Sequence, residues 1–82
     1  NEAEPQEHAA NAALRANELP LAARYAKRAV ELRPDAASGH RLLGMSFAAA
    51  NKPASAKRAL EKALSLDPKD VEARQQLEQL DA

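Results

Sequence analysis

Apolar and polar positions at the end of the chain follow the spacing of an α-helix. The apolar residues there are interpreted as one stripe, Val71, Ala73, Leu77 and Leu80, and the positions around them carry Glu72, Gln75, Gln76, Glu78 and Gln79. A helix with one apolar and one polar face packs on one side and leaves the other in water. The pattern predicts a helix over residues 71–82 that closes a helical array.

Residues 37–50 are apolar on two sides of one predicted helix. Leu43, Gly44 and Phe47 share one side, where Phe47 is expected to fill the gap beside Gly44. At about 100° per residue, the opposite side carries Ser38, Leu42, Met45 and Ala49, with Arg41 beside them. An apolar side must be covered by something. This second side is predicted either to bind a partner or to pack against neighbouring helices.

Pro, Asn and Asp residues predict where the helices begin and end. Pro5, Pro20 and Pro53 suit first helical turns, because proline has no backbone N–H to donate there. Asn17 and Asn51 can take the left-handed conformation that ends a helix, Asp35 and Asp70 are predicted N-caps, and Pro34 and Asp67-Pro68 stop the helices before them. The chain is thereby divided into five helices.

The chain also repeats itself. A shift of 34 residues aligns Ala3 with Ala37, Ala16-Asn17 with Ala50-Asn51, Ala22 with Ala56, Arg24 with Arg58, Ala29 with Ala63, Leu32 with Leu66 and Pro34 with Pro68. Each period holds two of the predicted helices. The periodicity predicts two stacked helix pairs, 3–36 and 37–70, followed by the closing helix.

The second unit resembles the tetratricopeptide repeat, whose pattern runs W-x2-L-G-x2-Y, A-x3-F, Ala and Pro. It contains Leu43-Gly44-x2-Phe47, Ala56-x3-Leu60, Ala63 and Pro68, with His40 in the place of the Trp. The first unit keeps Ala22, Ala29 and Pro34 but has Gln6, Ala9-Ala10, Ala13 and Ala26 where larger residues and Gly are expected, so it is a degenerate copy. The resemblance implies an all-α fold, with antiparallel helix pairs stacked as a short right-handed α-solenoid of five helices in one domain over 1–82.

In the tetratricopeptide family the inner helices line a concave groove that receives peptides. By this resemblance, the groove would be formed by the first, third and fifth helices, apolar in the middle and polar at both ends. His40 is expected to be a partly buried packing residue, and His8 an exposed one. The candidate partner-binding residues are Ser38, Arg41, Leu42, Met45 and Ala49, together with His8, Asn11, Arg15, Gln76 and Gln79.

Some members of the family bind the carboxyl-terminal tails of chaperones through a clamp of Lys, Asn, Asn, Lys and Arg. Only Asn11 fits that pattern here, because Glu7, Met45, Gln75 and Gln79 stand at the other positions. The resemblance therefore does not extend to a carboxylate clamp.

Composition supports one small helical domain. A chain of 82 residues has room for one core, and its abundance of Ala and Leu, with Val30 and Val71 as its β-branched residues, disfavours a sheet. Twelve basic and twelve acidic side chains cancel, which disfavours nucleic acid as a partner. The second helix of each pair is nevertheless basic, and a convex face that binds an anionic partner stays as a third hypothesis; these residues are Arg24, Lys27, Arg28 and Arg33, then Lys52, Lys57, Arg58 and Lys62.

The remaining observations concern chemistry and location. Cys is absent, and His8 and His40 lie on different predicted helices without a second ligand at metal-binding spacing, so no metal, cofactor or catalytic site is expected. No apolar run approaches the roughly 20 residues of a membrane span, which predicts a soluble protein. Its compartment stays open, with the cytoplasm slightly favoured. The start, without Met or a signal peptide, predicts a segment of a longer protein.

The leading functional hypothesis is a scaffold or adaptor module that binds a peptide or helix of a partner protein. The alternative is a structural or self-associating repeat segment, in which a second copy covers the apolar surface.

Overall fold

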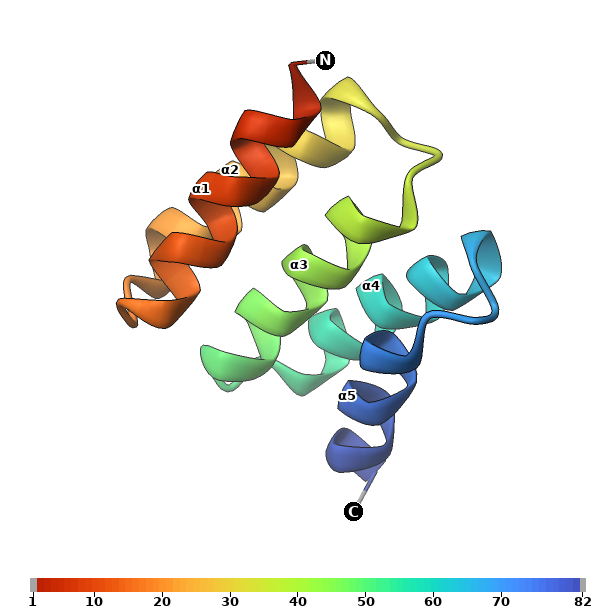
Figure 1. Ribbon diagram of the computed structural model, residues 1–82. Coiled ribbons are helices and arrows are strands. Elements are labelled where there is room, and N and C mark those ends of the chain that lie inside the picture. Colours follow the sequence, from red (N-terminus) through yellow and green to blue (C-terminus); the bar gives the residue numbers. More distant parts are fainter. Residues whose placement is uncertain (1, 82) are drawn as a thin grey trace.

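The computed structural model describes residues 2–81 as five helices joined by short turns (Figure 1). They are α1 (Ala3–Arg15), α2 (Leu19–Leu32), α3 (Ala37–Ala49), α4 (Pro53–Leu66) and α5 (Val71–Asp81). Each helix packs against the next one in the chain, and α3 also contacts α1 and α5. The prediction of an all-helical repeat architecture is confirmed. The prediction for position 82 lies outside the described residues, as does the side chain of Asp81.

The two asparagines predicted to end helices do so. Asn17 and Asn51 have φ angles of 59° and 62°, the left-handed region in which Asn is tolerated better than most residues. Behind Asn17, the N–H of Glu18 donates to the carbonyl oxygen of Ala13 at 2.8 Å; behind Asn51, the N–H of Lys52 donates to that of Phe47 at 2.9 Å. These bonds satisfy carbonyls that the helix end leaves free. The first helix of each pair, α1 and α3, therefore ends in the same way.

Of the two predicted N-caps, one is confirmed and one is wrong. Asp70 caps α5, because its Oδ1 accepts the N–H of Ala73 at 3.1 Å. Asp35 does not cap α3: the residue in the cap position is Ala36, with extended backbone and no side-chain hydrogen bond. Asp35 lies in the turn that follows Pro34, one residue too early for its carboxylate to take that role.

Gly44 lies where α3 and α4 approach most closely. A Cβ added there would stand 2.6 Å from Cγ of Leu60 and 3.3 Å from the carbonyl oxygen of Ala56. Both partners are fully buried. The predicted close crossing at Gly44 and Ala56 is thus present. Phe47 is half-buried, and its role in filling the gap beside Gly44 stays a prediction.

Two small clusters make up the core. One joins Ala10, Ala26 and Leu42, from α1, α2 and α3. The other joins Leu60, Ala63 and Ala73, and Leu77 and Leu80 of α5 pack against it. These clusters are built mainly from Ala because the helices lie close together, and small side chains permit that spacing.

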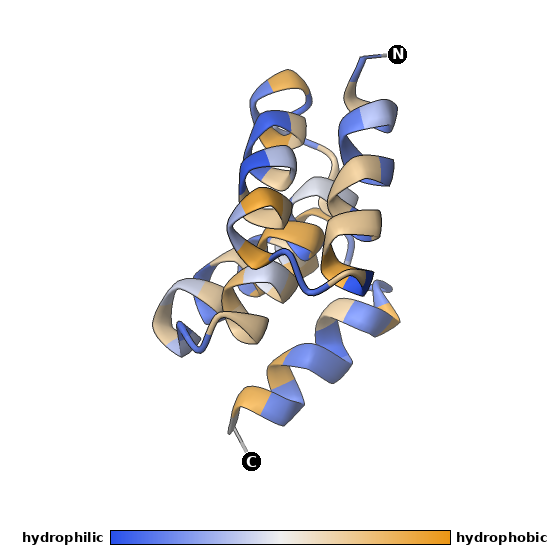
Figure 2. Cartoon of the chain, turned by 90° about the vertical axis from the view of Figure 1, so that its left-hand side faces the viewer, coloured by the Kyte–Doolittle hydropathy of each residue, from blue (hydrophilic) through white to orange (hydrophobic). Residues whose placement is uncertain are grey.

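Val71 was wrongly assigned to the apolar stripe of α5, since it is 63% exposed. At about 100° per residue it lies about 160° from Ala73 around the helix, so it faces away from α4. Ala73, Leu77 and Leu80 do share the packed side. In Figure 2, α5, the helix leading to the C label, is mostly blue with scattered apolar residues, as expected for a helix that packs on one side.

Candidate functional site

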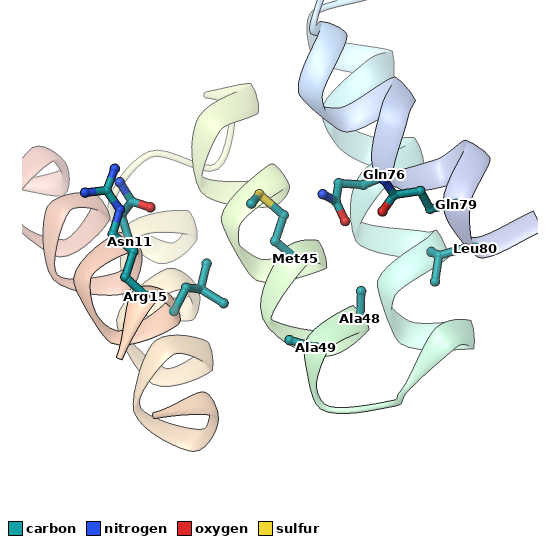
Figure 3. Close-up of a pocket in the computed structure, with 9 residues that line it drawn as sticks. Asn11, Arg15, Met45, Ala48, Ala49, Gln76, Gln79 and Leu80 are labelled. Atoms are coloured by element: carbon teal, nitrogen blue, oxygen red, sulfur yellow. The ribbon is translucent and has the colours of Figure 1, made fainter. Parts of the chain in front are cut away.

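A groove runs between α1, α3 and α5, with α3 as its floor. Both α1 and α5 contact α3, but no Cα atom of α1 comes within 8 Å of one in α5. The groove contains a cleft of about 500 Å³, lined by Asn11, Leu14, Arg15, Met45, Ala48, Ala49, Gln76, Gln79 and Leu80. Figure 3 shows α1 supplying one wall, α3 the floor and α5 the other wall. Six of the ten predicted site residues, from all three helices, line this one cleft.

The cleft is apolar at its centre and polar on its walls. Met45 lies half-buried on the floor, and Leu14 and Leu80 are half-buried on the two sides. The amides of Asn11 and Gln79 are exposed above them, one on each wall. Amide side chains can both donate and accept hydrogen bonds, and the flexible Met side chain can adjust to several shapes. The arrangement can hold an apolar side chain on the floor and polar main-chain groups along the walls.

Leu42 is largely covered and does not line the main cleft, although it borders a smaller hollow at the other end of the groove. It is 7% exposed and packs against Ala10 of α1 and Ala26 of α2. This burial favours the packing alternative for Leu42. Of the two large apolar residues predicted on this side of α3, Met45 is the one that reaches the open cleft.

Arg41 is held in an ion pair that ties α3 to the start of α5. Its Nη1 lies 2.8 Å from Oδ2 of Asp70, whose side chain is only 4% exposed. The same carboxylate caps α5 through its other oxygen. The positive charge of Arg41 is therefore balanced by Asp70, and Arg41 adds little positive charge to the groove. Local sequence pattern could not reveal this pair, because 29 residues separate the partners.

The far end of the groove is acidic. Ser38 Oγ donates to Oε2 of Glu7 at 2.8 Å, which joins α3 to α1. Glu7, His8 and Glu72 surround a smaller hollow of about 190 Å³ there, together with Asn11, Arg41, Leu42 and Met45. Arg15 stands at the opposite end, beside the larger cleft. The groove thus has a basic end and an acidic end.

Neither histidine has metal-site geometry. His8 is exposed on α1, and His40 is half-buried, with Nε2 2.8 Å from the carbonyl oxygen of Pro34. Because a carbonyl only accepts, the ring carries its proton on Nε2 in this bond. Among residues 2–81, no three His, Cys, Asp or Glu side chains gather into a potential metal site. Within that same stretch, no helix has both the length and the apolar character needed to cross a membrane.

Consecutively packed helix pairs with a groove along their inner helices define a helical repeat protein. Residues 37–70, which contain α3 and α4, match the family model of the tetratricopeptide repeat. That match and the five-helix architecture together fit a tetratricopeptide-like repeat protein, a class whose members generally serve protein–protein interaction. No curated protein matches the chain.

Proposed function

We propose that this protein is an interaction module that binds an extended segment of a partner protein in the groove between α1, α3 and α5. The observation that carries the proposal is the uncovered apolar floor at Met45, between two amide-bearing walls whose Cα atoms stay more than 8 Å apart. An apolar anchor in the middle of a polar rim is the usual anatomy of a protein interface.

The amides on the walls favour an extended segment over a helix. A helix satisfies its own main-chain N–H and C=O groups, whereas an extended chain needs partners for them. Asn11, Gln76 and Gln79 can supply such partners from both sides of the cleft. The charges at the two ends favour one direction, with an acidic residue of the partner near Arg15 and a basic one near Glu7 and Glu72.

The test uses peptides selected from a displayed library of random extended sequences against the intact chain. The selected peptides are expected to bind the parent protein and to lose at least about tenfold in affinity against Met45→Glu, because a carboxylate on the floor would lose its water without gaining a partner. The control is Met45→Leu, which keeps the apolar surface. Circular dichroism and thermal melting verify that both variants fold.

If the selected peptides bind the parent and a folded Met45→Glu variant equally well, the groove is not the binding site. Sedimentation at several concentrations addresses the self-association alternative. A dimer that Met45→Glu dissociates would place a second copy, rather than a partner segment, in the groove.

A further inference from the structure

On the side of α3 away from the groove, the outer helices α2 and α4 enclose a second, larger hollow. No Cα atom of α2 comes within 8 Å of one in α4. The space between them measures about 720 Å³, against about 500 Å³ for the groove cleft. Its floor is the α3 residues His40, Leu43 and Phe47, and this floor with its two walls is here called the outer hollow.

The two glycines of α3 explain why the outer hollow is open. A Cβ on Gly39 would lie 3.2 Å from Cγ2 of Val30, and one on Gly44 would lie 2.6 Å from Cγ of Leu60. Gly39 therefore marks where α2 touches α3, and Gly44 marks where α4 touches it. About 100° per residue places these contacts about 140° apart around α3.

The three floor residues of the outer hollow lie on the surface of α3 between its contacts with α2 and α4. Counted from Gly39, Leu43 lies at about 40°, Phe47 at about 80° and His40 at about 100° around the helix. All three are half-buried. The walls do not close over them because α4 presents Ser55 and Ala59 there, side chains too short to reach α2. An aromatic and aliphatic surface is thereby left open between two fixed helices.

The rim of the outer hollow is mainly basic. Arg58 and Lys62 stand on the α4 wall. Glu61, at the outer edge of α4, is the acidic residue of the lining. In the described part of the chain, none of these three side chains forms an ion pair with another residue. The rim thus keeps a net positive charge that the fold itself does not neutralise.

We propose that the outer hollow is a second docking site, which takes a partner segment with a large apolar side chain flanked by carboxylates. The apolar side chain packs on Leu43 and Phe47, where an aromatic ring gains both burial and ring-to-ring contact. The neighbouring carboxylates pair with Arg58 and Lys62, and the Arg58 guanidinium can bind one of them in bidentate fashion. Charge complementarity selects an acidic segment over a basic or neutral one.

The position of this site makes it independent of the groove. Met45 faces the groove, whereas Leu43 and Phe47 face the outer hollow, so α3 lies between the two surfaces. One copy of the chain can hold a segment on each side. In this arrangement the module joins two partner segments across a single helix.

The experiment titrates the isotope-labelled chain with the synthetic peptide Asp-Glu-Trp-Leu-Asp-Glu and follows backbone amide signals by NMR. Saturable shifts at Leu43, Phe47 and Ala59, with a Kd of about 1 mM or tighter, are expected. Two control peptides separate the contribution of charge from that of the apolar side chains. One replaces the acidic residues by Lys, and the other replaces Trp-Leu by Ser-Ser. Both should bind at least about tenfold more weakly.

A matched pair of variants tests the site. Lys62→Glu reverses a charge on the rim and should lower the affinity for the acidic peptide at least about tenfold. Lys57→Glu makes the same charge change at an α4 residue that does not line the outer hollow, about 200° around the helix from Ser55, and should leave the Kd within about twofold. Lys57 and Lys62 are both exposed, so both variants should fold, which thermal melting verifies. The Met45→Glu variant should bind this peptide with the same Kd as the parent, which distinguishes the outer hollow from the groove.

Four results would overturn the proposal. They are equal binding of the acidic and Lys-containing peptides, equal weakening by Lys57→Glu and Lys62→Glu, and shifts that map to Asn11 and Gln79 instead. The fourth is a peptide-free dimer that Lys62→Glu dissociates, because a second copy would then occupy the outer hollow.

Discussion

The replacement of Gly44 by alanine is expected to destabilise the protein, although alanine is the better helix former. Gly44 has ordinary helical backbone angles, so only the space around its Cα is at issue. A Cβ would stand 2.6 Å from Cγ and 2.8 Å from Cδ2 of Leu60, both inside contact distance. Leu60 is fully buried and cannot swing into water.

Two terms oppose each other in this substitution. Replacing Gly by Ala in a helix stabilises it by about 1 kcal/mol, while overpacking a close contact costs about 1–3 kcal/mol. At 2.6 Å, the branch point of Leu60 rather than its far end must move, which places the cost at the upper part of that range. The net loss is therefore about 1–2 kcal/mol, or a fall in melting temperature of about 4–16 °C for a domain of this size.

Gly39 supplies the matched control. A Cβ there would meet Cγ2 of Val30 at 3.2 Å, and Val30 is only half-buried. A shift of a few tenths of an ångström relieves that contact, so the gain in helix propensity decides the sign. Gly39→Ala is expected to be neutral or to stabilise the protein by up to about 1 kcal/mol.

Urea and thermal unfolding, followed by circular dichroism, measure both variants. In a Leu60→Ala background the obstructing side chain is gone, and Gly44→Ala should lose its penalty. The reasoning is refuted if Gly44→Ala is as stable as Gly39→Ala, or if its effect is the same with and without Leu60.

Three further predictions concern single positions. Asp70→Ala removes both the cap of α5 and the partner of Arg41, and it should lower the free energy of unfolding in urea by about 2–4 kcal/mol. A loss under about 1 kcal/mol would contradict the role of Asp70 in joining α3 to α5. The stability of Val71→Lys should stay within about 0.5 kcal/mol of the parent's, because the side chain is already in water. Ala73→Lys should detach α5 from α4, which circular dichroism would show as a loss of helicity. Equal melting curves for the two variants would contradict the orientation of α5. Asn17→Ala should lower stability by about 1 kcal/mol and Asn17→Gly should not, because only the alanine Cβ resists a positive φ; two equal melting temperatures would show that the turn is not the cause.

The central position of α3 gives the two proposals a common origin. Its sequence is apolar on two sides, and each side meets a different set of helices. Met45 reaches the groove between α1 and α5, while Leu43 and Phe47 reach the outer hollow between α2 and α4. In both places α3 contacts two helices whose Cα atoms stay more than 8 Å apart. The residues between those contacts are consequently left open to solvent or to a partner.

Local signals in the sequence were sufficient for the architecture. The asparagines that end helices, the prolines in first turns and the cap at Asp70 act within a few residues of their own position. The 34-residue repeat then placed equivalent helices in equivalent surroundings, and the family resemblance of the second unit indicated the close crossing at Gly44. These features are encoded locally, which is why the helix count and the pairing of helices could be predicted.

Tertiary structure alone decided which apolar side chains are available and which charges are free. Leu42 and Met45 are only three positions apart on one helix, yet α1 and α2 cover the first and leave the second in the cleft. The Arg41–Asp70 pair joins residues 29 apart, so no local pattern marks it. The outer hollow exists because Gly39 and Gly44 set where two other helices contact α3, and the distance between those helices is a property of the packed fold.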